Sequence, residues 1–173
     1  MSGPEGSSIK NVRLCVVAFF LRSEIMSDEE YMKIAYQQAC LARGIDEVPI
    51  GAIIVKDGEI IAKAYNQKES THDVTAHAEM IAIREACQKL GNWHLDGCTL
   101  YSTLEPCIMC SGAIIQSRIE KVVFAAKGQR WHGLSTFLAN HEFNHHPQVI
   151  SGILEKKCCL LLSQYFKGKR NHN

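Results

Sequence analysis

Hydrophobic positions along the chain change their spacing several times, and each change predicts a new helix or strand. Spacings of three and four residues are typical of amphipathic helices, whereas β-branched runs bounded by turn residues are typical of strands. The predicted elements are, in chain order, a helix over 28–43 capped by Ser27 or Asp28, a hairpin that turns at Asp57-Gly58, a helix that Thr75 can cap and that runs to about Leu90, a strand over 98–104, a helix from Cys107 to about Gln116, a strand over 121–127, a loop-like stretch over 128–146, a short strand over 148–153 and a closing helix over 154–170. Strands that alternate with helices predict a layered α/β domain with a mixed central sheet.

The first 25 residues do not continue this pattern, and we expect the folded domain to span 26–173. Within residues 1–25, the apolar run Leu14–Leu21 is too short to cross a bilayer, which needs about 20 residues. Basic residues precede the run, as in a secretory signal peptide, but no small-residue cleavage site follows it. We expect an N-terminal extension that is disordered or reflects a non-native start, with a signal peptide as the alternative.

Composition places the chain among ordinary globular proteins, because 46% of its 173 residues are hydrophobic and 21% are charged. The formal net charge of +1 gives no argument for or against a nucleic-acid partner, so any basic surface must be local. The eight cysteines are irregularly spaced, and a chain of this length does not need disulfides. We therefore expect mostly reduced cysteines and a cytoplasmic protein.

Two short motifs place metal-binding side chains at the starts of two predicted helices. His77-x-Glu79 opens the first helix, and Pro106-Cys107-x-x-Cys110 opens the second. Zinc favours Cys thiolate and His imidazole, and two Cys side chains three residues apart lie on one face of a helical turn. The combination of His-x-Glu with Pro-Cys-x-x-Cys is the signature of zinc-dependent base deaminases. The sequence therefore predicts a catalytic zinc site with His77, Cys107 and Cys110 as its ligands.

Three protein ligands leave the fourth position of a tetrahedral zinc ion open to water, as catalytic sites require. Glu79 lies two residues from His77, and side chains at that spacing do not face each other on a helix. We expect Glu79 to reach the water and act as general acid and base instead of binding the metal. A structural zinc site closed by a fourth ligand is one alternative, and two buried thiols without a metal are another.

The segments HAEMIAIREA and TLEPCIMCSGAIIQSRI resemble the TadA-type tRNA adenosine deaminases, which belong to the cytidine deaminase-like superfamily. The resemblance extends over about Asp28 to Arg170. It implies a three-layer α/β/α cytidine deaminase-like domain, one Zn²⁺ per subunit and a homodimer. It also implies hydrolytic deamination of adenosine to inosine at the wobble position of a tRNA anticodon, with Glu79 carrying a proton from the zinc-activated water to N1 of the purine.

The same resemblance implies six substrate-binding residues, which are Asn66, Ala78, Leu104, Phe166, Lys169 and Arg170. The residues themselves leave other interpretations open. Asn66 follows a predicted strand, where asparagine is a common turn residue. Phe166 is equally compatible with core packing, and basic residues are favoured at helix C-termini because of the helix dipole.

The resemblance fails over 127–137, where the bacterial family usually has a basic-acidic pair and here the acidic residue is missing. Since this loop borders the substrate in the family, the RNA context of the target base is not transferred to this chain. A guanine or other free-base or nucleoside deaminase on the same scaffold is therefore an alternative function. Two further alternatives are a catalytically silent partner subunit, which the presence of Glu79 argues against, and a structural zinc module.

Overall fold

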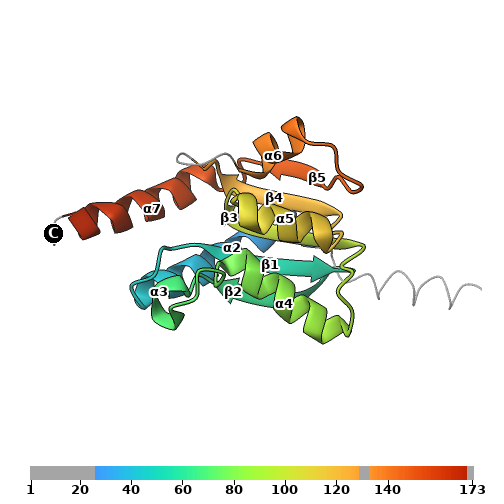
Figure 1. Cartoon of the computed structure of the whole chain (residues 1–173). Helices are drawn as coiled ribbons and strands as arrows, with labels where there is room; N and C mark the ends of the chain where they lie inside the picture. Colours follow the sequence, from blue (N-terminus) through green and yellow to red (C-terminus); the bar gives the residue numbers. More distant parts are fainter. Residues whose placement is uncertain (1–25, 129–132, 171–173) are drawn as a thin grey trace, which may run out of the picture.

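Five strands form one mixed sheet in the computed structural model, which describes residues 26–128 and 133–170 (Figure 1). The sheet has the strand order β2-β1-β3-β4-β5. The strands are β1 (Gly51–Lys56), β2 (Glu59–Tyr65), β3 (Cys98–Leu104), β4 (Lys121–Ala126) and β5 (Gln148–Ser151). The helices are α2 (Asp28–Gly44), α3 (Lys68–Thr71), α4 (Ala78–Leu90), α5 (Ile108–Gln116), α6 (Leu134–Asn140) and α7 (Glu155–Arg170). The expected N-terminal extension, residues 1–25, lies outside the described residues.

Helices cover both faces of the sheet and give it two hydrophobic cores. Successive residues of a strand point to opposite faces, so neighbouring side chains enter different cores. Ile54 and Leu100 pack with residues of α4, α5 and α6. Ile53 and Tyr101 pack on the other face with residues of α2 and α7. This arrangement confirms the predicted three-layer α/β/α fold with a mixed central sheet.

The sheet topology places the carboxyl ends of β3, β4 and β5 at the same end of the sheet. β1 pairs antiparallel with both β2 and β3, whereas β3, β4 and β5 run parallel. The hairpin turns at Asp57 and Gly58, whose φ angles of 51° and 81° are those that an Asp-Gly turn favours. Ligand sites in open α/β sheets lie outside the carboxyl ends of the parallel strands, here the ends of β3 and β4.

Two of the predicted segments differ from the structure. Helix α4 begins at Ala78 with His77 as its N-cap, and the prediction that Thr75 caps this helix is wrong. The backbone N–H and the hydroxyl of Thr75 both donate to the Asp73 carboxylate, at 2.8 and 2.7 Å, so Thr75 belongs to the preceding turn. The loop-like stretch over 128–146 contains α6, which has a single fully buried residue and hence no clear hydrophobic repeat.

Gly51 allows α2 to pack closely on β1. A Cβ atom at this position would overlap the backbone carbonyl of Ala35 and the backbone nitrogen of Ala39. We expect Gly51→Ala to lower the free energy of unfolding by about 1–3 kcal/mol, because neither backbone atom can move without shifting the helix. Gly44→Ala is the matched control, since nothing lies within 4 Å of its Cβ. Urea denaturation of both variants checks this, and equal stability would contradict it.

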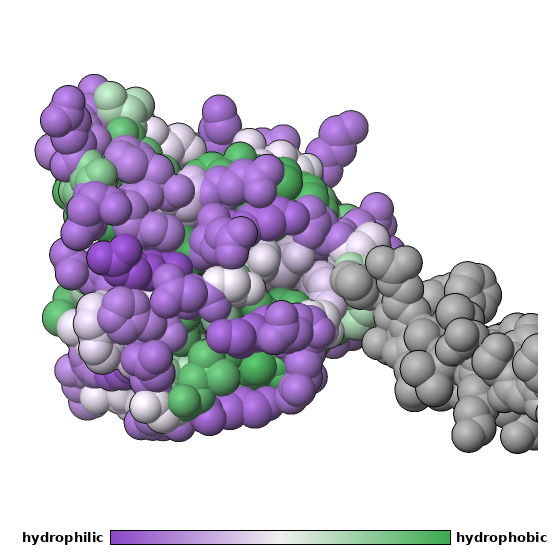
Figure 2. Space-filling view, turned by 90° about the vertical axis from the view of Figure 1, so that its right-hand side faces the viewer, coloured by the Kyte–Doolittle hydropathy of each residue, from purple (hydrophilic) through white to green (hydrophobic). Residues whose placement is uncertain are grey.

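The described residues contain no helix long and apolar enough to cross a membrane. All seven cysteines among them are free, in agreement with the expectation from their spacing. The end of the molecule where β3 and β4 begin, on the right in Figure 1, has a mostly hydrophilic surface with small separate apolar areas (Figure 2). A concave groove lies elsewhere, beside the strand ends.

Candidate metal centre and substrate groove

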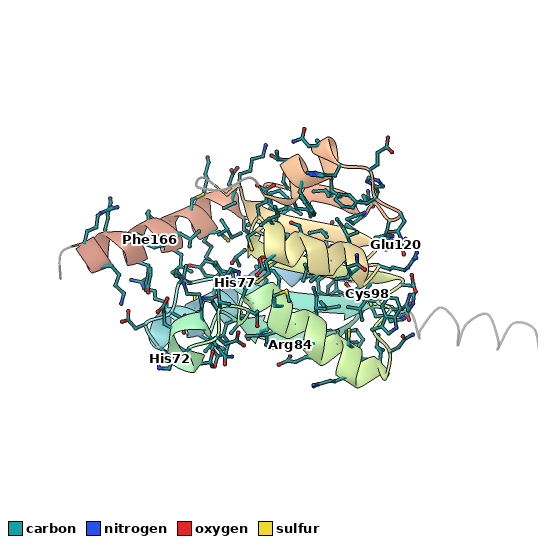
Figure 3. The ribbon with its side chains drawn as sticks, viewed as in Figure 1. His72, His77, Arg84, Cys98, Glu120 and Phe166 are labelled. Atoms are coloured by element: carbon teal, nitrogen blue, oxygen red, sulfur yellow. The ribbon has the colours of Figure 1, made fainter. Side chains whose placement is uncertain are left out.

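Two helix N-termini bring three metal-binding side chains together. His77 is the N-cap of α4, and Cys107 is the N-cap of α5, directly after the turn that leaves β3. Cys110 follows in the first turn of α5 and is fully buried. Figure 3 shows His77 far from Cys98 and Glu120, which mark the opposite end of the sheet. Among the described residues, His77, Cys107 and Cys110 are the only such group with ligand atoms close enough to share a metal ion.

The geometry of these three residues fits zinc. His77 Nδ1 lies 3.6 Å from the sulfur of Cys107 and 3.6 Å from that of Cys110, and the two sulfurs are 3.6 Å apart. Tetrahedral zinc, with Zn–S of about 2.3 Å and Zn–N of about 2.0–2.1 Å, separates its ligand atoms by about 3.5–3.8 Å. The three atoms are therefore spaced like three corners of a zinc tetrahedron.

Hydrogen bonds among the three groups shift their proton affinities. The bond between the two sulfurs lowers the pKa of Cys107 to about 4. The same bond raises the pKa of Cys110, because one of the paired thiols keeps its proton while the other ionises. The bond with Cys107 raises the pKa of His77. An anionic sulfur at a helix N-terminus is also stabilised by the helix dipole, which suits a thiolate ligand.

Glu79 lies in the first turn of α4 with its carboxylate at the metal centre. The side chain is 3% exposed, and burial raises its pKa. One carboxylate oxygen accepts a hydrogen bond from Ser102 Oγ at 3.2 Å, and the other lies 3.8 Å from the sulfur of Cys110. A carboxylate in this position can hold or release a proton beside the open corner of the tetrahedron.

Asn66 and Ala78 are buried residues, one at the exit of β2 and the other next to the metal-binding residue His77. Asn66 directly follows β2, is 3% exposed and donates from Nδ2 to the Glu47 carboxylate at 3.1 Å. The backbone N–H of Gln67 donates to the carbonyl of Ala76 at 3.0 Å, which ties this strand exit to the residue before His77. Ala78 is the buried first residue of α4.

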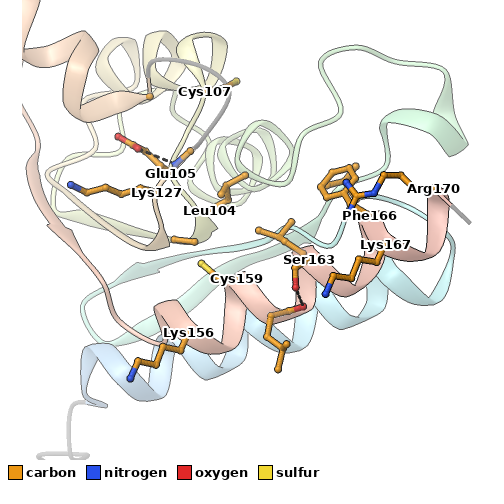
Figure 4. Close-up of a pocket in the computed structure, with 16 residues that line it drawn as sticks. Leu104, Glu105, Cys107, Lys127, Lys156, Cys159, Ser163, Phe166, Lys167 and Arg170 are labelled. Atoms are coloured by element: carbon orange, nitrogen blue, oxygen red, sulfur yellow. Dashed lines mark hydrogen bonds between the residues drawn. The ribbon is translucent and has the colours of Figure 1, made fainter.

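A groove of about 790 Å³ runs between the ends of β3 and β4 and one side of α7, and Cys107 lies on its wall (Figure 4). Its apolar lining includes Leu104 and Phe166. Its cationic side chains are Lys127, Lys156, Lys167 and Arg170. A cationic groove with an apolar floor suits a polyanion that carries flat bases.

The structure separates the three tRNA-contact residues that the sequence suggests. Phe166 and Arg170 line the groove, but Lys169 does not, because its amino group forms an ion pair with Asp46 and lies 5.6 Å from the ring centre of Tyr165. Lys127 and Lys167 are not among the residues that the sequence indicated. Residue 167 is one helical turn before Arg170, and this spacing is the signal that could have indicated a shared face.

Glu105 anchors the segment that departs from the family pattern. Its carboxylate accepts hydrogen bonds from the backbone N–H groups of Gly128, at 3.2 Å, and Ser135, at 3.0 Å. Gly133 packs so closely on this carboxylate that any Cβ would overlap it. This role of Glu105 depends on contacts across more than 20 residues and cannot be predicted from local sequence patterns.

Comparison with known proteins identifies the family. Residues 25–126 match the family described as the cytidine and deoxycytidylate deaminase zinc-binding region. The chain is 51% identical to the tRNA-specific adenosine deaminase of Bacillus subtilis over 83% of this chain and 91% of the relative. A solved structure from a study of A-to-I editing by tRNA:A34 deaminases shares 40% identity and a TM-score of 0.73, with 77% of this chain and 99% of that chain covered.

A guanine deaminase structure from Bacillus subtilis shares 48% identity with a TM-score of 0.57, but covers only 59% of this chain and 66% of that chain. The similarity to tRNA-specific adenosine deaminases is more extensive and includes most of the length of both proteins. The chain therefore belongs to the tRNA-specific adenosine deaminase family, within the cytidine deaminase-like zinc-dependent deaminases.

Proposed function

We propose that this protein catalyses the hydrolytic deamination of adenosine to inosine at the wobble position of a tRNA anticodon. The observation that carries the proposal is the buried carboxylate of Glu79 beside the His77, Cys107 and Cys110 cluster, at one end of a cationic groove. Two relatives that are 51% and 49% identical to this chain are named as tRNA-specific adenosine deaminases, which supports the same reaction and substrate. The folded unit is a deaminase domain that spans 26–173.

His77, Cys107 and Cys110 hold one zinc ion per subunit. When bound, zinc lowers the pKa of a water molecule toward neutrality and so supplies a nucleophile at cellular pH. The spacing of the three ligand atoms, 3.6 Å for each pair, supports this ligand set. Glu79 stays outside it and keeps its carboxylate for proton transfer.

Glu79 takes a proton from the attacking water and delivers it to N1 of the purine, while the oxygen bonds to C6. It then takes the proton of the new C6 hydroxyl and passes it to the amine, so that C6=O forms, the C6–N bond breaks and ammonia leaves. Ser102, which donates to one carboxylate oxygen, leaves the other oxygen for the substrate side. Burial favours this shuttle because it raises the pKa of Glu79 and eases its protonation during the cycle.

The substrate nucleotide contacts Asn66, the backbone at Ala78 and Leu104. The flanking RNA follows the groove, where Phe166 offers a ring for base stacking and Arg170 a cation for the phosphates. Leu104 supports this path, since it lies at the end of β3 and lines the groove. A homodimer completes the functional unit; the exposed Ile108 on the cysteine-bearing helix α5 supports a contact there.

One assay tests the function. The protein is incubated with an anticodon stem-loop that carries adenosine at the wobble position, and inosine is measured by nuclease digestion and mass spectrometry. Guanine, free adenosine and free cytidine are tested in parallel, because of the 48% identity to a guanine deaminase. Inosine from the stem-loop alone supports the proposal. Ammonia from guanine without inosine would move the protein to the nucleobase deaminases.

The groove makes a specific prediction about charge. We expect the double variant Lys167→Ala/Arg170→Ala to raise KM for the stem-loop by about 10-fold or more, because two phosphate contacts are lost. For the same reason, KM should depend less strongly on salt concentration. Lys169→Ala is the matched control on the same helix end, since that amino group pairs with Asp46. Initial rates of the wild type, the double variant and the control at two salt concentrations check this prediction. An equal effect of Lys169→Ala would place the RNA on the other side of α7.

A further inference from the structure

Glu47 is a fully buried carboxylate outside the metal centre. It is 0% exposed, and the next residue, Val48, lines the groove. None of the ion pairs among the described residues includes Glu47. A buried carboxylate without a cation is costly unless hydrogen-bond donors surround it. The position of Glu47 therefore needs an explanation.

Three donors surround this carboxylate. The backbone N–H of Ser70 and the Ser70 hydroxyl donate to Oε1, at 2.7 and 2.9 Å. Asn66 Nδ2 donates to Oε2 at 3.1 Å. Because all three partners donate, the acceptor must offer oxygen on both sides, which a carboxylate does and an amide does not.

The contact fixes which end of the Asn66 amide faces the substrate side. The hydrogen-bond network assigns the amide nitrogen to Glu47, so the oxygen, Oδ1, lies on the opposite side. Asn66 is also held by its backbone N–H, which donates to the carbonyl of Ile50 at 3.0 Å. Oδ1 has no hydrogen-bond partner among the described residues, and none of their fully buried polar side-chain atoms lacks one. Oδ1 is therefore not fully buried and can accept a further hydrogen bond.

We infer that Glu47 is a positioning residue, which holds the Asn66 amide so that its oxygen accepts a hydrogen bond from the substrate nucleoside. The inference rests on the proposed function in one respect, namely that Asn66 contacts the substrate. The substrate group that it recognises is a donor, such as a ribose hydroxyl or a ring N–H. With the amide reversed, Asn66 would present its NH₂ to that donor and the contact would be lost.

Glu47→Gln tests the inference with little change in volume. The amide nitrogen introduced at position 47 then faces the amide nitrogen of Asn66, and two donors cannot bond to each other. This repulsion is relieved when the Asn66 amide reverses. We expect kcat/KM for the stem-loop to fall by about 10- to 100-fold, while zinc content and the far-ultraviolet circular dichroism spectrum stay as in the wild type. Ser70→Ala is the matched control, because it removes a bond to Glu47 but keeps the bond to Asn66. It should stay within about twofold of wild type.

A double variant separates positioning from a structural role. In the double variant Glu47→Gln/Asn66→Asp, the amide introduced at position 47 donates to the carboxylate introduced at position 66. The second oxygen of that carboxylate again faces the substrate. We expect this variant to recover most of the activity that Glu47→Gln loses, whereas Asn66→Asp alone, with two carboxylates in contact, should not. The inference would be overturned if Glu47→Gln kept full activity. It would also be overturned if Glu47→Gln lost activity and the double variant did not recover it.

A substrate-free measurement keeps this result distinct from failure of the proposed function. In the NMR spectrum of the wild type, the Asn66 side-chain amide should show one proton shifted and protected from exchange by Glu47, and Glu47→Gln should abolish this. An unprotected amide in the wild type would overturn the inference even if inosine forms. Absence of inosine with a protected amide would refute the proposed substrate and leave the positioning contact in place.

Discussion

Glu79→Gln is expected to reduce inosine formation by about 1,000-fold or more while the protein remains folded and loaded with zinc. The substitution keeps the size of the side chain and its ability to accept from Ser102 Oγ, but the amide can no longer carry a proton from water to the purine. The side chain is buried beside the metal centre, so the substitution acts directly on the group that faces the three metal-binding residues.

Glu85→Gln is the matched control for this prediction, because Glu85 lies on the same helix and is exposed. Single-turnover assays with the stem-loop, combined with metal analysis by mass spectrometry, separate loss of chemistry from loss of zinc. A Glu79→Gln protein that still makes inosine at a tenth of the wild-type rate would exclude Glu79 as the proton carrier.

Cys110→Ala is expected to remove zinc and, with it, all measurable deamination. The sulfur of Cys110 is 3.6 Å from both other ligand atoms, and two ligands hold zinc far more weakly than three. We expect the zinc content to fall from about one ion per chain to below about 0.1. Cys87→Ala is the control, since Cys87 is a free, half-buried cysteine on α4 outside the ligand group.

The same variant distinguishes a catalytic from a structural zinc ion. Both hydrophobic cores are built on the sheet without the metal ligands His77 and Cys107, so the fold should survive the loss of zinc with a lower melting temperature. Circular dichroism and thermal denaturation of Cys110→Ala report on this. Complete unfolding of the variant would favour the structural zinc module over a catalytic centre.

Local sequence patterns predicted the elements that carry the chemistry, but not all of their surroundings. The strand over 98–104 and the hairpin at Asp57-Gly58 follow from side-chain alternation and turn chemistry, which act over a few residues. The metal-binding group follows from residue types at helix starts. In contrast, the start of α4 depends on whether Thr75 caps the helix or bonds to Asp73, and spacing alone does not decide between these.

Contacts between distant residues could not be predicted in the same way. Glu47 looks like an ordinary charged residue after a helix, and only the fold brings Asn66 and Ser70 to its carboxylate. The groove likewise requires α7 to lie beside the ends of β3 and β4. The sequence resemblance suggested Phe166 and Arg170, but the ion pair of Lys169 with Asp46 becomes visible only in three dimensions.

The way α7 is attached has a consequence for the motions of the protein. Only Cys158 and Leu161, both in its first half, are buried, and Figure 1 shows the second half extending away from the sheet. Polar contacts tie that half to the body: the Tyr165 hydroxyl donates to the Asp46 carbonyl, Arg43 donates to the Gln164 side chain, and Lys169 pairs with Asp46. Segments with few buried apolar contacts open locally at a fraction of the global unfolding free energy. Amide hydrogens near Arg170 should therefore exchange much faster than those of α4, and RNA that settles in the groove would slow this exchange.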